Sequence, residues 1–280
     1  MALEKETMDE PCRIRAMRLP LFYVNAFPDR PFSGNPAAVC LLNSWLDDRL
    51  LRKVAAENNL SATAFLVPLG DAYEIRWFTG LSELKLCGHA TFASGYVVLN
   101  LLRPGLDSIT FATRLKGSVS VRKDGEFLAM DFPALFPKPG TAVPERLFQA
   151  LDLSPRSCEV LEVNETYFVV MENPEVVQNL QPNTELLRQL HPYAVSVSAA
   201  GEKADFVSRY FAPGYGISED PVTGSAHCAL TPYWSKRLGK SRLHARQLSP
   251  RGGELWCETA GDRVILRGKA VLTMRGSLEI

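Results

Sequence analysis

The stretch SRYFAPGYGISEDPVTGSAHCALTPYW (Ser208–Trp234) decides the fold, because an earlier stretch repeats its order of elements. It begins with a β-rich run, passes through an acidic loop and opens a helix at Gly224. The earlier stretch, RWFTGLSELKLCGHATFASGYVVLNLL (Arg76–Leu102), also begins with Arg and two aromatic residues, passes an acidic loop and opens an apolar helix at Gly88. Strand, loop, Gly-polar-Ala and helix therefore occur once in each half, which indicates an internal duplication.

Two duplicated helix starts suggest a binding site. The first N–H groups of a helix lack partners and carry a partial positive charge of about +0.5, so they can hold an anion. Two such starts facing one cleft between domains would clamp a small carboxylate-bearing molecule, and Gly88 and Gly224 would let it approach the backbone closely. For either helix alone, a Gly or Ser that simply begins a helix is the better explanation, and only the pairing of the two starts favours a binding site.

Polar side chains flank both helix starts. The helix dipole should lower the pKa of His89 and keep it neutral. His89 is then either able to donate or accept a proton, or simply bonded to a nearby loop. Asp220 precedes Pro221, which favours an extended conformation; it is either an acid–base residue or a loop cap. Ser225 would offer its N–H and hydroxyl to an anion. Ser225 and His227 stand two residues apart on a helix and diverge, and no G-x-S-x-G elbow occurs, so a serine hydrolase is excluded.

Composition excludes several other classes. The chain has 280 residues, 46% of them hydrophobic, with Lys+Arg and Asp+Glu balanced at 31 each, so no basic surface for nucleic acid is predicted. No apolar run is long enough to span a membrane. The four histidines lack metal-ligand spacing, and neither GxGxxG nor a Walker motif appears, so we expect neither a metal nor a nucleotide cofactor. The six cysteines form no CxxC pair, which favours free thiols and a cytoplasmic protein.

The chain divides into three parts. Residues 1–16 are polar and mixed in charge, which predicts a flexible leader. Residues 17–133 form the first half. A proline-rich segment at Pro133–Leu147 is typical of a linker, and residues 134–280 form the second half, whose last strands are free to return to the first.

Four segments resemble the PhzF family of phenazine biosynthesis-like proteins. They are FSGNPAAVCLL (Phe32–Leu42), NLSATAF (Asn59–Phe65), RWFT…CGHATFAS (Arg76–Ser94) and SRYFAP…EDPVTGSAH (Ser208–His227). They follow the family's order along nearly the whole chain. The resemblance implies the diaminopimelate-epimerase-like α+β fold, with two similar halves, each a β-sheet curled around a central helix. It also implies a cofactor-free isomerase that moves a proton on a small carboxylated substrate, and a homodimer.

The resemblance also assigns roles. His89 corresponds to the family's active-site histidine and Asp220 to its active-site aspartate. Ser225 and the backbones of Gly88 and Gly224 correspond to groups near the substrate carboxylate.

One position departs from the family. Its central acid–base residue is a glutamate in a segment that usually reads N-L-S-E-T-x-F, and here Ala62 occupies that place, beside Ser61 of the substrate-binding group. A methyl group cannot carry a proton, and loss of a positioned acid–base residue typically costs about 10²–10⁴-fold in rate. Glu57 lies upstream on the preceding predicted helix, where we expect it to face solvent. Ala62 is consistent with a natural pseudoenzyme, with different chemistry through His89 and Asp220, or with a deliberate knock-out.

Racemases of the same fold use two cysteines, one on each side of the substrate. Here Cys87 precedes its glycine by one residue, whereas Cys228 follows its glycine by four, so the two registers are not equivalent. We interpret both as small buried apolar residues.

Two functions of different classes remain. The first is a PhzF-like isomerase, with His89 and Asp220 moving protons and the helix starts holding the carboxylate. The second is a catalytically silent binding or regulatory protein on the same scaffold, which Ala62 favours.

Overall fold

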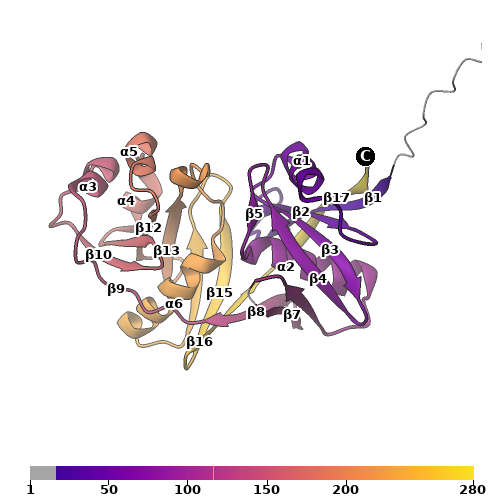
Figure 1. The fold of residues 1–280 in the computed structure, drawn as a ribbon. Coiled ribbons are helices and arrows are strands. Elements are labelled where there is room, and N and C mark those ends of the chain that lie inside the picture. The colour runs from indigo at the N-terminus through magenta and orange to yellow at the C-terminus, as the bar shows by residue number, and fades with distance from the viewer. Residues whose placement is uncertain (1–16, 116) are drawn as a thin grey trace, which may run out of the picture.

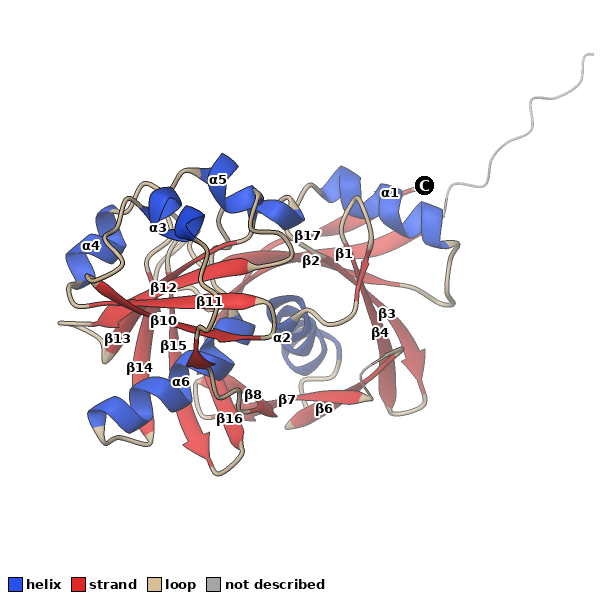
Figure 2. Cartoon of the chain, turned by 60° about the vertical axis from the view of Figure 1, so that its left-hand side comes forward, coloured by secondary structure: helices blue, strands red, loops and turns tan. Residues whose placement is uncertain are grey.

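The computed structural model describes residues 17–115 and 117–280 (Figure 1). The leader predicted at residues 1–16, with Cys12, lies outside the described residues. Two halves stand side by side, and in each one strands surround a central helix (Figures 1 and 2). The predicted α+β fold with a curled sheet around a helix in each half is confirmed.

The first half contains most of the N-terminal elements. Its strands are β1 (Arg18–Ala26), β2 (Asn35–Leu41), β3 (Thr63–Leu69), β4 (Ala72–Phe78), β5 (Glu83–Leu84), β6 (Ser108–Thr113), β7 (Ser118–Asp124) and β8 (Phe127–Pro133). Its helices are α1 (Asp48–Asn58), α2 (Gly88–Tyr96) and the π-helix η1 (Val97–Leu102).

The remaining elements follow in the second part of the chain. The strands are β9 (Lys138–Pro139), β10 (Cys158–Val163), β11 (Thr166–Met171), β12 (Ala194–Ala200), β13 (Phe206–Phe211), β14 (Arg242–Gln247), β15 (Gly253–Ala260), β16 (Arg263–Gly268) and β17 (Ala270–Glu279). The helices are α3 (Glu145–Leu151), α4 (Pro174–Asn179), α5 (Thr184–Arg188), the 3-10 helix η2 (Pro213–Tyr215) and α6 (Gly224–Leu238).

One ladder of strands connects the halves. In the first half β1, β2, β3, β4, β6, β7 and β8 pair in this order, and β8 then pairs antiparallel with β16. From β16 the ladder continues through β15, β14, β13, β12, β11 and β10 to β9. The last strand, β17, pairs with β1 from Arg18↔Glu279 to Ala26↔Ala270, so the end of the chain lies in the first half.

The two central helices are buried on nearly all sides. Seven of the nine residues of α2, from His89 to Gly95, are buried, and the helix packs against β1, β2, β3, β7, β8 and β17. A helix that is apolar all round belongs in a core. The sequence predicted one regular helix to Leu102, but the chain changes to a π-helix at Val97. The second central helix, α6, packs against β14, β15 and β16 and contacts α2.

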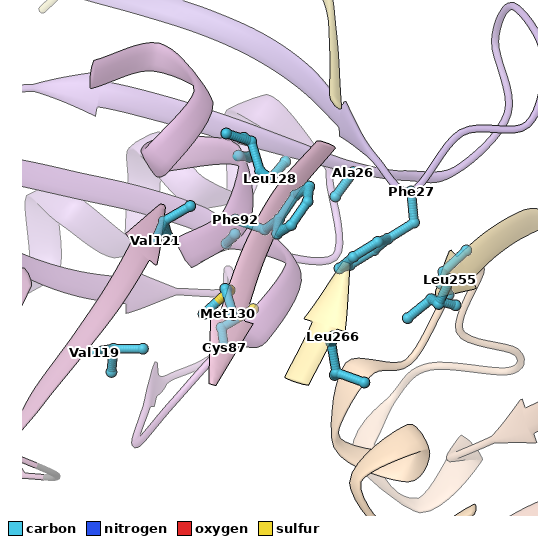
Figure 3. Packing of buried hydrophobic residues seen from close by; sticks show 14 of the residues in the cluster. Ala26, Phe27, Cys87, Phe92, Val119, Val121, Leu128, Met130, Leu255 and Leu266 are labelled. Atoms are coloured by element: carbon cyan, nitrogen blue, oxygen red, sulfur yellow. The ribbon is translucent and has the colours of Figure 1, made fainter. Parts of the chain in front are cut away.

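A single hydrophobic core runs through both halves. It contains residues of both central helices and of the strands around them. Phe27 lies at the junction: its ring centroid is 4.3 Å from that of Phe92 on α2, and Leu255 and Leu266 lie on its other side (Figure 3). Two smaller clusters sit under the outer helices, one beneath α1 and one beneath α3, α4 and α5. The shared core fixes the two helix starts relative to each other.

Candidate functional site

The site is built around the first turns of α2 and α6. Cys87 precedes Gly88 at the start of α2, and Thr223 precedes Gly224 at the start of α6. Neither Cys87 nor Thr223 caps its helix with a side-chain hydrogen bond. Because first-turn N–H groups lack intrahelical partners, both starts keep the donors and the partial positive charge that an anion needs.

A chain of hydrogen bonds joins the two helix starts. His89 Nε2, on α2, lies 3.2 Å from Ser61 Oγ, and Ser61 Oγ donates to Asn35 Oδ1 at 3.0 Å. Asn35 Nδ2 in turn donates to Asp220 Oδ1 at 2.8 Å and to the Val222 carbonyl oxygen at 2.9 Å. Asn35, at the first position of β2, is completely buried. The structure therefore brings His89, Ser61 and Asp220 into one network.

The other oxygen of Asp220 is bound from its own loop. Thr223 Oγ1 donates to Asp220 Oδ2 at 2.6 Å. The Gln247 side chain, at the end of β14, bridges this loop: its Nε2 donates to the Asp220 carbonyl at 2.7 Å, and its Oε1 accepts from the Thr223 N–H at 2.8 Å. Each carboxylate oxygen of Asp220 thus accepts a hydrogen bond, and its backbone is fixed by a strand.

Burial moves the pKa of both proton-handling candidates. Burial raises the pKa of Asp220 from 3.8 to about 6, against the hydrogen bonds from Thr223 and Asn35 that lower it, while the Glu219 charge adds a rise. Burial lowers the pKa of His89 from 6.5 to about 4. At neutral pH His89 is therefore neutral, and Asp220 exchanges its proton within reach of physiological pH.

The network also fixes the proton position on His89. Because Ser61 donates its hydroxyl proton to Asn35, its oxygen accepts from His89, which places the ring proton on Nε2. The bare Nδ1 then lies 3.5 Å from Cys87 Sγ, within reach of a weak S–H donor. The hydrogen bonds that run from His89 through Ser61 and Asn35 to Asp220 are therefore all donated in the direction of Asp220.

Ala62 faces the central helix of its half. Ala62 and Ala64 belong to the core around α2, whereas Phe65 belongs to the cluster beneath α1, as expected for side chains that alternate along a strand. Ala62 is completely buried. The position that corresponds to the family glutamate therefore lies on the inner face of the sheet, next to Ser61.

The predicted binding residues differ in exposure. Gly88 is half-buried and Gly224 is buried, while Ser225 in the first turn of α6 is exposed and forms no side-chain hydrogen bond with the described residues. His89 and Asp220 are each only 9% exposed. Solvent therefore reaches Gly88, Ser225 and the half-buried Ser61, but hardly reaches His89 and Asp220.

Three residues of the network were not predicted from the sequence: Asn35, Thr223 and Gln247. Asn35 stands in the Gly-Asn-Pro turn and Thr223 directly before the second helix glycine, so turn chemistry gave a weak signal for both. No sequence pattern around Gln247 indicates its role, because a glutamine in a strand can bind the Asp220 loop only after β14 has folded beside that loop.

The cysteines are buried as interpreted. Burial raises the pKa of Cys87 and of Cys228 to about 12. Cys228 Sγ contacts the Gly224 carbonyl, one turn inside α6, rather than standing before the helix as Cys87 does. The two thiols are therefore not equivalent in the two halves.

Three further findings concern the described ranges, 17–115 and 117–280. No group of three or more His, Cys, Asp or Glu side chains there is arranged to hold a metal ion. None of their helices is long and apolar enough to cross a membrane. Two cavities, of about 310 and 510 Å³, are lined mainly by residues of α2, η1, β7, β8, β17 and β1, and neither is lined by His89 or Asp220.

Comparisons with known proteins agree with this fold. Residues 24–276 match the family described as phenazine biosynthesis-like protein. An uncharacterized isomerase of Pseudomonas aeruginosa is 48% identical over 94% of this chain and 100% of its own length. The phenazine biosynthesis-like domain-containing protein of Homo sapiens is 39% identical over 94% of this chain and 99% of its own.

Solved structures give the same result. A PhzF-family phenazine biosynthesis protein from Enterococcus faecalis superimposes with a TM-score of 0.88 and 40% identity, covering 94% of this chain and 100% of that one. A hydroxyproline epimerase from Agrobacterium vitis, at 8% identity and a TM-score of 0.59, shares the fold alone. The chain belongs to the PhzF family of phenazine biosynthesis-like proteins, and its relatives support an isomerase function.

Proposed function

We propose that the protein is a cofactor-independent isomerase that moves a proton on a small carboxylate-bearing substrate held between α2 and α6. The observation that carries this proposal is the hydrogen-bonded series His89–Ser61–Asn35–Asp220, which joins the two helix starts. An isomerase of this kind must remove a proton from one carbon and return one to another, so it needs groups that change protonation near neutral pH.

Asp220 and His89 suit these two steps. Ionised Asp220 takes the proton as a carbon–hydrogen bond breaks, and the same carboxyl, with its pKa near 6, can return a proton as the new bond forms. Neutral His89 holds its proton on Nε2, and by releasing Ser61 it can donate this hydrogen bond to charge that develops on the substrate. No electrons are gained or lost, which is consistent with chemistry that needs no redox cofactor.

The glycines support a ligand at the helix starts. A Cβ atom added at Gly88 would lie 3.9 Å from Phe132 Cζ, and one added at Gly224 would lie 3.6 Å from Leu266 Cδ1. Both are ordinary van der Waals distances, and neither glycine has a positive φ. The fold itself therefore does not require glycine at either position, whereas close approach of a carboxylate to the N–H groups does.

Ala62 favours a second candidate function. Its buried methyl stands on the inner face next to Ser61, where the family's glutamate would act. If proton transfer depends on that glutamate, the chain is a silent binding or regulatory protein with an intact carboxylate site. Homodimer formation and a cytoplasmic location remain predictions from the sequence.

Solvent-deuterium exchange separates the two candidates. The protein and its Ala62→Glu variant are incubated in D₂O with small carboxylates that carry a C–H bond next to a double bond or a carbonyl group, and mass spectrometry detects incorporation. Asp220→Asn in each background is the control. Exchange in the unmodified chain that Asp220→Asn abolishes supports the isomerase. Exchange only in Ala62→Glu supports the silent protein, and exchange that survives Asp220→Asn refutes the role of Asp220.

A further inference from the structure

A partly buried ion pair braces the loop before each central helix. In the second half Arg209 of β13 binds Glu219 through two parallel bonds, Nε–Oε1 at 2.7 Å and Nη2–Oε2 at 2.9 Å, with side chains 8% and 16% exposed. In the first half Arg76 of β4 binds Glu83 in the same way at 2.8 and 2.8 Å. Bidentate Arg–carboxylate pairs of this kind fix geometry as well as charge.

The two pairs occupy the same register in the duplicated halves. Each glutamate stands five residues before the glycine that begins a central helix, Glu83 before Gly88 and Glu219 before Gly224. Each arginine also lies over the aromatic ring two residues along its strand, with the guanidinium carbon 4.9 and 5.0 Å from the ring centroids. The halves differ in the next residue: Leu84 follows Glu83, whereas Asp220 follows Glu219.

Arg209 also anchors the Asp220 loop to the outer layer of the second half. Its Nη1 donates to the Leu180 carbonyl at 2.7 Å and to the Val177 carbonyl at 3.2 Å, at the end of α4. The remaining two nitrogens hold Glu219. One guanidinium therefore connects the last turn of α4 with the residue directly before Asp220.

Three other titratable groups in the described residues are linked to Asp220 and carry no charge at neutral pH. Cys87 and His89 at the start of α2 and Tyr210 on β13 are all affected by burial, which raises the pKa of the thiol and the phenol and lowers that of the imidazole. Glu219 is the charged carboxylate that acts on Asp220, and it does so beside the compensating charge of Arg209.

We propose that Arg209 and Glu219 are positioning residues for Asp220: the pair fixes the loop before α6 and sets the balance of charge at the Asp220 carboxyl. This inference rests on the proposed role of Asp220 in proton transfer, but its test does not depend on activity. Glu219→Gln removes the negative neighbour and leaves Arg209 uncompensated, so both effects lower the pKa of Asp220. Arg209→Met removes the positive charge and leaves Glu219 uncompensated, so the pKa of Asp220 rises.

The experiment measures the pKa of Asp220 by ¹³C NMR of the full chain labelled at the aspartate carboxyl carbon. The Asp220 signal is the one missing from Asp220→Asn. We expect Glu219→Gln and Arg209→Met to shift this pKa in opposite directions, each by about half a unit to one unit for charges several ångströms apart. Glu83→Gln removes the matched carboxylate of the first half and should leave it unchanged.

A merely structural brace gives a different result. Loosening the loop by either substitution would expose Asp220 to water, and its pKa would fall toward the ordinary value in both variants. Shifts of the same sign, or a shift in Glu83→Gln as large as that in Glu219→Gln, would therefore overturn the proposal. If Arg209→Met does not fold, Arg209→Gln replaces it: it removes the charge but keeps N–H donors for the carbonyl groups of α4, so a rise in the Asp220 pKa supports the proposal and a fall contradicts it. If no substrate shows deuterium exchange, the proposed isomerase function is refuted. The Asp220 pKa shifts still test the positioning role, because the NMR measurement needs no substrate.

Discussion

The buried Asp220 carboxyl should lower the stability of the protein at neutral pH. Its pKa in the folded chain is about 6, compared with the ordinary value of 3.8. A separation of about two pH units, at about 1.4 kcal/mol for each unit, corresponds to about 3 kcal/mol. A raised pKa means that the folded state favours the protonated carboxyl over the ionised one. The protein therefore has the full contribution of this carboxyl to its stability at a pH below the unfolded pKa of 3.8, and it loses this contribution as the pH rises through 6.

Asp220→Asn should therefore stabilise the protein above pH 7 and have no such advantage near pH 4. The amide can accept only one of the two hydrogen bonds that the carboxylate accepts from Asn35 and Thr223. This loss offsets about 1 kcal/mol of the gain in the free energy of unfolding. We expect the free energy of unfolding of Asp220→Asn, relative to the unmodified protein, to increase by about 2–3 kcal/mol between pH 4 and pH 8.

Urea denaturation followed by circular dichroism at several pH values measures this difference. The comparison between the two proteins removes the contribution of His89, whose lowered pKa has the opposite effect and destabilises the folded state as the pH falls toward 4. Asp71→Asn, at a fully exposed aspartate, is the control and should leave the pH dependence unchanged. A difference that stays constant from pH 4 to pH 8 would refute the burial of an ionising carboxyl at this position.

Three further results are expected. Gly95→Ala should lower the free energy of unfolding by about 1–3 kcal/mol, because its Cβ would lie 2.5 Å from Val121 Cγ1; thermal denaturation that shows no loss would contradict this packing of α2. Gly224→Ala should leave the melting temperature almost unchanged yet weaken the binding of small carboxylates in calorimetry, whereas equal affinity would argue against a carboxylate at the start of α6. The Cys87 thiol, with its pKa raised to about 12, should resist iodoacetamide at pH 8 until urea is added; mass spectrometry of the native protein would detect the contrary.

The sequence by itself determined the repeated unit and marked several candidate site residues. Strand, acidic loop and glycine-led helix occur twice at equivalent places, because each half must bury one apolar helix inside its own curled sheet. Local chemistry also marks Gly88, His89, Asp220 and Gly224, since turns and helix starts depend on residues close together in the chain. The departure at Ala62 is likewise readable from the sequence alone.

Only the tertiary structure decided how these residues connect. Asn35 comes from β2, His89 from α2 and Asp220 from the loop before α6, and the pairing of β8 with β16 and the shared core hold the two halves in place. Gln247 and Arg209 act on the Asp220 loop from separate strands of the second half. Hydrogen bonds and burial between residues far apart in the chain depend on how strands and helices pack, and no local pattern specifies them. The raised pKa of Asp220 is therefore a property of the fold. The sequence predicted a lowered pKa for His89 from the helix dipole, whereas burial is the cause in the folded chain.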